Sequence, residues 1–147
     1  MVTEAAIAAR KPPQKIESSL SEQLKELINL YFQYNSTQQL EPLLELFVED
    51  MTWIYPSSKG ASKAAYAKQV SKTFKLAALF IAHHAVKPEQ IMVEGNKAIA
   101  RWQFEYSIRG CGCTGKPWRK QGFNSYEFDT STPGKPRIRM VHTEVVR

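Results

Sequence analysis

Apolar residues recur at three- and four-residue intervals through the first half of the chain, and this spacing predicts helices. The first predicted helix begins at Ser19 or Ser21, either of which can cap it, and it ends at residues 35–36. A second helix begins near Gln38, and a third covers roughly residues 61–79. The apolar side of the first helix consists of Leu20, Leu24, Leu27, Ile28, Tyr31 and Phe32.

Alternation of apolar and polar residues follows the helices, and this pattern predicts β-strands. Helices followed by strands predict an α+β fold, in which three N-terminal helices pack on the concave face of a curved antiparallel β-sheet. The longest strand has its apolar face at Ala98, Ala100, Trp102, Phe104 and Tyr106. The predicted strands are residues 51–55, 80–86 with a continuation at 91–93, 97–108, 118–129 and 137–146.

A length of 147 residues allows one domain with a single core. Pro12 and Pro13 separate the first helix from residues 1–18, which we expect to form a flexible arm, and the domain covers residues 19–147. No apolar run reaches the roughly 18 residues that a membrane-spanning helix requires, so we expect no membrane segment. The absence of a secretory signal and of a disulfide framework favours a cytoplasmic location.

The formal net charge of +6 comes from basic residues near both ends of the chain. Such a charge could belong to a patch that binds nucleic acid or an anionic ligand. No stripe of interleaved aromatic and basic residues forms a stacking platform for bases. The pattern therefore favours solvated charges on strand faces and edges over a nucleic-acid partner.

The two cysteines, Cys111 and Cys113, are separated by one residue, and this spacing disfavours a disulfide between them. A zinc site would need two further ligands, and the three histidines are not spaced as ligands near this segment. We therefore expect reduced cysteines, no metal and no cofactor.

The run LYFQYNSTQQLEPLLELFVEDMTWIYP carries Tyr31 on the first helix and Asp50, nineteen residues later, at the start of a strand. This order resembles the opening of the SnoaL-like/NTF2-like superfamily, which includes ketosteroid isomerase and polyketide cyclases. The segment IAHHAVKPEQIMVEGNKAIARW is similar to a pattern in SnoaL-like and scytalone-dehydratase-like members. The resemblance implies an NTF2-like cone with a pocket inside it.

The resemblance also implies catalytic residues on three elements. In the ketosteroid-isomerase branch, the tyrosine that corresponds to Tyr31 donates a hydrogen bond to a developing oxyanion. Tyr55 stands where that branch has a carboxylate base, and a phenol with a pKa near 10 is a poor base but a serviceable hydrogen-bond donor. Matching the family favours His83 over the adjacent His84 as the histidine inside the pocket, where an imidazole would transfer a proton.

The last strand leaves two possibilities open. Simple alternation puts His142 and Glu144 in the cavity as a base and its orienting carboxylate, whereas a bulge, which the family often has here, would turn Thr143 inward. We expect Asp50 to have a structural role in hydrogen bonding. The residues expected to line the substrate pocket are Trp53, Trp102, Phe104, Tyr106, Asn124 and Phe128.

These residues predict a cofactor-independent lyase or isomerase of the dehydratase, isomerase or cyclase type. It would transfer protons on a hydrophobic polyketide-, terpenoid- or aromatic-like substrate in an aromatic-lined pocket. The alternative is a non-catalytic NTF2-like module that binds a ligand or holds a dimer together, because function resides in sites and not in folds. We also expect a homodimer through the outer face of the sheet, because the superfamily usually pairs there.

Overall fold

The computed structural model describes residues 19–108 and 118–146, without the side chains of residues 82–85. The predicted arm at residues 1–18 and both cysteines lie outside the described residues. None of the helices in the described ranges is long and apolar enough to cross a membrane. The elements are α2 (Leu20–Ser36), α3 (Leu40–Glu45), β1 (Phe47–Tyr55), β2 (Ser58–Ala61), α4 (Lys63–Phe80), β3 (Ile81–Glu94), β4 (Lys97–Ile108), β5 (Trp118–Asp129) and β6 (Arg137–Val146).

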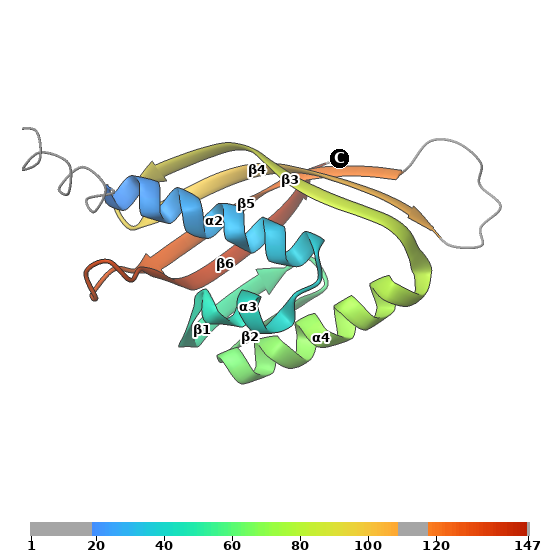
Figure 1. Ribbon diagram of the computed structural model, residues 1–147, viewed down its shortest axis with the longest axis horizontal. Helices are drawn as coiled ribbons and strands as arrows, with labels where there is room; N and C mark the ends of the chain where they lie inside the picture. Colours follow the sequence, from blue (N-terminus) through green and yellow to red (C-terminus); the bar gives the residue numbers. More distant parts are fainter. Residues whose placement is uncertain (1–18, 109–117, 147) are drawn as a thin grey trace, which may run out of the picture.

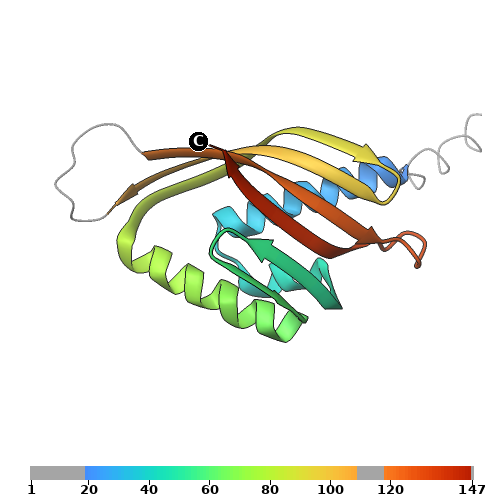
Figure 2. The same cartoon turned by 180° about the vertical axis from the view of Figure 1, so that it is seen from behind.

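Six strands form one curved sheet in the order β2-β1-β6-β5-β4-β3. Helix α2 crosses the concave face of this sheet, and α3 and α4 lie beside the end formed by β1 and β2 (Figure 1). The opposite face, here called the outer face, carries no helix from the described part of the chain (Figure 2). The predicted α+β cone with helices on the concave face is confirmed.

The sheet is mixed, whereas the sequence predicts a wholly antiparallel one. β1 and β6 run parallel, with Trp53 opposite Val141, and every other neighbouring pair is antiparallel. After β1 the chain passes through β2 and α4 to the far edge, and it returns through β3, β4 and β5. Alternation along each strand is the same in both directions, so it could not reveal the parallel pair.

β1 begins at Phe47, four residues before the predicted start at Met51. Phe47 continues the apolar spacing of the preceding helix, which is why the sequence suggests helix at this position. In the structure Phe47 is fully buried, and the amide of Ile138 in β6 donates a hydrogen bond to the carbonyl of Leu46 at 2.7 Å. Pairing with β6 therefore ends the helix early.

A short strand, β2, lies between the predicted strand at residues 51–55 and the predicted third helix. It pairs with β1 so that Gly60 lies opposite Trp53. A Cβ atom at Gly60 would overlap the indole ring of Trp53. The missing side chain thus lets the indole lie across β2, where its Nε1 donates to the hydroxyl of Ser58 at 3.2 Å.

β6 contains a bulge at Arg139. Ile138 pairs with Phe128, and Met140 pairs with the adjacent Glu127. Arg139 is therefore an extra residue in the ladder. Ile138 and Val141 are consequently both fully buried although they are three residues apart. Beyond the bulge, Thr143 shares the concave side with Val141.

The core lies between the helices and the concave face. Two of its fully buried members are tyrosines, and a buried hydroxyl needs a hydrogen-bond partner. Those partners define the candidate site. The largest fully buried side chains are Tyr66, Tyr126, Phe47, Phe128, Leu24, Ile28, Leu43, Met51, Ile138 and Val141.

Candidate functional site

Three tyrosines from three elements form a chain of hydrogen-bonded hydroxyls, here called the phenol chain. Tyr31 comes from α2, Tyr55 from the end of β1 and Tyr66 from the first turns of α4. The hydroxyl of Tyr55 lies 2.9 Å from that of Tyr31 and 2.6 Å from that of Tyr66. Two hydrogen bonds use two of the three O–H protons, so the third can be donated to another acceptor.

Burial keeps these phenols protonated. It raises the pKa of Tyr31, and it raises the pKa values of Tyr55 and Tyr66 well above their usual range. Hydrogen bonds, including those from Thr143 and Asn124, partly offset the rise in the pKa of Tyr31. At neutral pH the phenol chain therefore donates hydrogen bonds and does not act as a base.

A second polar chain lies beside the first on β4 and β5. Nε1 of Trp102 donates to Oδ1 of Asn124 at 3.0 Å, and Nδ2 of Asn124 donates to the hydroxyl of Tyr126 at 2.9 Å. The ring of Tyr126 packs edge-on against Tyr31, with centroids 5.5 Å apart. Because the indole can only donate, it fixes the orientation of the Asn124 amide.

Tyr31, Tyr55 and Asn124 lie on a cavity of about 380 Å³ between α2, α4 and the sheet. This volume lies within the range that suits a small-molecule ligand. No Asp, Glu or His from the described residues lines it. Its apolar walls are Phe32, Pro56, Val70, Phe74, Ala77, Val86, Trp102 and Phe104. Its other polar groups are Asn35, Gln38, Ser57, Gln69, Thr73, Lys120 and Thr143.

The predicted lining residues divide into two groups. Trp102, Phe104 and Asn124 line the cavity as expected. Trp53 and Phe128 belong to the buried core below it and do not line it. Tyr106 is half-buried and stacks on Phe104, with centroids 5.1 Å apart, so it supports the wall from behind.

Of the predicted histidines, His142 has a described side chain, and it does not join the phenol chain. The backbones of His83 and His84 pair with Ser107 and Tyr106, but both side chains lie outside the described residues, so the role of His83 stays a prediction. His142 is placed on the outer face, where its Nε2 lies 3.6 Å from Oε1 of Glu144. The bulge at Arg139 causes this, because it turns Thr143 to the concave side instead.

Asp50 has contacts that fit a structural role. Its carboxylate lies 3.4 Å from the guanidinium of Arg139, which also contacts Asp129 at 3.1 Å. One arginine thus joins β1 to the end of β5 across the bulge. All three side chains are at least partly exposed, so these ion pairs contribute little to the stability of the fold.

The sequence pattern does not mark Tyr66 and Lys120 as polar residues of the site. Tyr66 has the apolar spacing of its helix, which indicates a core residue and gives its hydroxyl no role. Lys120 lies four positions before Asn124 in β5, and residues an even number of positions apart share one face of a strand. Extending the alternation back from Asn124 would have placed this lysine on the concave side.

Comparison with known proteins identifies the fold and then the family. A nuclear transport factor 2 (NTF2-like) superfamily protein from Salmonella enterica has a TM-score of 0.67 at 20% identity, covering 86% of this chain and 91% of that one. A protein from Sinorhizobium meliloti described as a candidate polyketide cyclase has a TM-score of 0.59 at 19% identity, covering 86% and 100%. A Catenulispora acidiphila protein with a ketosteroid isomerase-like fold, in complex with trimethylamine, has a TM-score of 0.62 at 14% identity, covering 81% and 84%.

These structures show that the chain has the NTF2-like fold, and at such low identity they show the fold alone. Residues 17–141 match the family model described as a SnoaL-like domain. This match covers most of the sequence, so the chain belongs to the SnoaL-like domain family. No curated protein matches the sequence.

Proposed function

We propose that the protein is a cofactor-independent enzyme of the lyase or isomerase type, acting on a hydrophobic polyketide-, terpenoid- or aromatic-like small molecule. The observation that carries this proposal is the phenol chain of Tyr31, Tyr55 and Tyr66 on an aromatic-walled cavity. The structural relatives described as a candidate polyketide cyclase and as ketosteroid isomerase-like are consistent with it.

The phenol chain suits a reaction in which negative charge develops on a substrate oxygen. Tyr31 donates to a carbonyl or hydroxyl oxygen, and the hydrogen bonds within the chain strengthen as charge grows on that oxygen. The flat apolar rings of the proposed substrate would pack against Phe74 and Trp102, two of the apolar walls of the cavity.

A proton acceptor is also required, and a phenol with a raised pKa does not supply one. We assign this role to one of the adjacent pair His83 and His84, because an imidazole titrates near neutral pH. The family resemblance favours His83, whereas the backbone of His84 pairs with Tyr106, in phase with the cavity-lining Phe104, and this register favours His84. Adjacent residues of a strand face opposite sides, so a single one of the two can serve. The proton passes from the carbon beside the substrate carbonyl to the imidazole and returns at another position.

The test uses proton exchange, which requires no knowledge of the natural substrate. The protein is incubated with 1-tetralone in deuterium oxide, and NMR measures deuterium entering the carbon next to the carbonyl. Tyr31→Phe should slow this exchange about a hundredfold, as loss of an oxyanion donor does. Tyr34→Phe is the matched control, because Tyr34 lies on the same helix but does not line the cavity. His83→Ala and His84→Ala identify the base.

Equal exchange by Tyr31→Phe and Tyr34→Phe would refute the role of the phenol chain. If tetralone binds but exchanges no faster than in buffer, the protein is a ligand-binding module and not this enzyme. Both outcomes require that the thermal midpoints of the variants stay close to that of the wild type.

We also propose a homodimer paired through the outer face. Ile99, Ser125, His142 and Ile54 are successive register partners across four strands of that face. Ile54 and Ile99 are 42% and 43% exposed there, and no helix from the described chain covers them. Light scattering should show twice the monomer mass of 16.8 kDa at micromolar concentration, and Ile99→Lys should shift it toward the monomer. A wild-type monomer would remove this proposal.

A further inference from the structure

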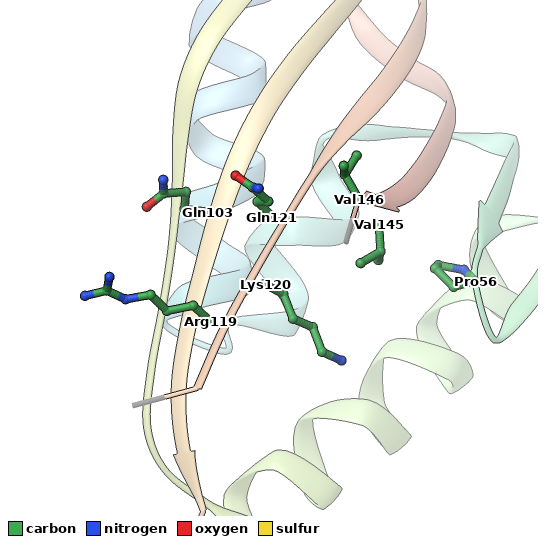
Figure 3. Close-up of a pocket in the computed structure, with 7 residues that line it drawn as sticks. All are labelled: Pro56, Gln103, Arg119, Lys120, Gln121, Val145 and Val146. Atoms are coloured by element: carbon green, nitrogen blue, oxygen red, sulfur yellow. The ribbon is translucent and has the colours of Figure 1, made fainter. Parts of the chain in front are cut away.

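A second pocket opens where β6 stops pairing with β5. The β5–β6 ladder ends at the pair Gln121–Val146, while the β4–β5 ladder continues to Trp118. The space beside this free stretch of β5 extends to Pro56 at the end of β1 and has a volume of about 820 Å³. Figure 3 shows its lining residues, and this pocket is here called the outer pocket.

Lys120 and Pro56 line both the outer pocket and the main cavity. Lys120 therefore borders both spaces. Its backbone pairs with Phe104, whose side chain lies in the cavity wall, so Lys120 leaves β5 on the concave side. Its Nζ atom lies 5.8 Å from the centre of the Tyr106 ring.

The charge of Lys120 is not neutralised by a carboxylate within residues 19–108 and 118–146. The adjacent Arg119 differs, because it points away from Lys120 and pairs with Glu105 at 2.9 Å (Figure 3). No Asp or Glu lines either pocket in the described chain. Helix α4, which forms one wall of the cavity, carries four lysines and no acidic residue.

A lysine without a carboxylate partner in the described chain, in linings that contain no described Asp or Glu, makes the space around Lys120 attractive to an anion. The other lining residues of the outer pocket suit an extended ligand. Val145 and Val146 offer exposed apolar surface, and Gln103 and Gln121 offer side-chain amides. Lys120 lies where the main cavity borders the outer pocket, so a group that reaches it belongs to a tail that extends away from the phenol chain.

We propose that the substrate is an elongated molecule with two parts. An apolar, carbonyl-bearing head occupies the main cavity at the phenol chain, and a tail ending in a carboxylate or phosphate reaches Lys120 and the outer pocket. This inference rests on the proposed function for the position of the head. The tail contact requires only Lys120 and the space around it.

Binding of matched probes tests the tail. The probes are 6-hydroxy-2-naphthyl compounds with alkyl tails of increasing length that end in a carboxylate, a phosphate or an uncharged methyl ester, and naphthol fluorescence reports binding. At low salt, the anionic probes should bind about threefold to fivefold more tightly than the ester, the range expected for an ion pair at an exposed site. The advantage should disappear at about 1 M salt.

Lys120→Met should abolish the advantage of the anionic probes and leave the affinity for the ester unchanged. Lys68→Met is the control, because Lys68 is an exposed lysine of α4 that lines neither pocket. Tighter binding of the phosphate than of the carboxylate identifies a phosphorylated tail, and the reverse identifies a carboxylic acid. Equal affinity of acid and ester in the wild type, or an equal loss for both in Lys120→Met, would overturn the proposal.

The two proposals fail in different ways. If tetralone does not exchange but Lys120→Met weakens the binding of anionic probes alone, the enzyme proposal is refuted and the proposal of a tail site is supported. Exchange that depends on Tyr31, with no preference for anionic probes, keeps the enzyme and removes the tail site.

Discussion

Replacing Tyr55 with phenylalanine removes the hydroxyl that lies between those of Tyr31 and Tyr66. Two hydrogen bonds disappear together. The hydroxyl of Tyr66, which is fully buried, loses its partner at 2.6 Å, and a stranded buried hydroxyl costs about 1–3 kcal/mol. Tyr31 loses one hydrogen bond at 2.9 Å, which costs about 1 kcal/mol. The free energy of unfolding should therefore fall by about 2–4 kcal/mol.

Tyr66→Phe removes the end of the phenol chain and leaves Tyr55 bonded to Tyr31, so it should cost about 1 kcal/mol. In the double variant the stranded hydroxyl of Tyr66 is gone as well. We expect the double variant to be no less stable than Tyr55→Phe alone, and more stable than the sum of the single losses by at least about 1 kcal/mol.

Urea unfolding of the wild type, both single variants and the double variant gives the four free energies that this cycle needs. Tryptophan fluorescence reports unfolding, and equal denaturant slopes show that the compactness of the states is unchanged. Losses that add within about 0.5 kcal/mol would mean that the Tyr55 and Tyr66 hydroxyls are not coupled. The phenol chain would then not exist in solution, and the proposed oxyanion donor would lose its support.

Burial raises the pKa values of the phenol chain and of Tyr126, so these groups keep their protons in the folded state after the unfolded phenols ionise near pH 10. The stability that this supplies is complete below about pH 10 and is lost above it, at up to about 1.4 kcal/mol per pH unit for each phenol, as urea unfolding at several alkaline pH values should show. Gly60→Ala should cost about 1–3 kcal/mol in a thermal or urea melt, because the new methyl group overlaps the ring of Trp53; an unchanged midpoint would contradict this packing. The purified wild-type protein should contain no zinc, which elemental analysis measures. Replacing Cys111 and Cys113 with serine should leave the fold intact.

The fold was largely predictable because its long strands alternate strictly. Strands 97–108, 118–129 and 137–146 have the bounds that alternation predicts. β2 was not predictable in the same way, since the sequence SKGA has no apolar side chain larger than alanine to mark a face. The parallel pairing of β1 with β6 depends on where distant segments meet, which local spacing does not encode.

The candidate site was predictable where a residue's position followed from one element alone. Tyr31 and Tyr55 lie together as the family resemblance implies, and Trp102 and Asn124 follow from alternation. Tyr66 required knowledge of how α4 packs against β1. The phase of β6 required knowledge of the bulge, and without it His142 could not be separated from Thr143.

The bulge at Arg139 makes the chemistry of the cavity depend on the number of residues in β6 as well as on their identity. Deleting Arg139 would remove the bulge but keep Val141 opposite Tyr126 and Thr143 opposite Asn124, so the hydroxyl wall would stay. Pairing all residues of β6 in a regular ladder would instead turn the rest of the strand over, and the wall now formed by Thr143 would carry His142 and Glu144, an imidazole with a carboxylate beside it. A substitution that abolishes the bulge at unchanged strand length can thus convert a hydroxyl wall into an acid–base wall. Gain or loss of a bulge in this strand is therefore a route by which such a cone can acquire a new reaction.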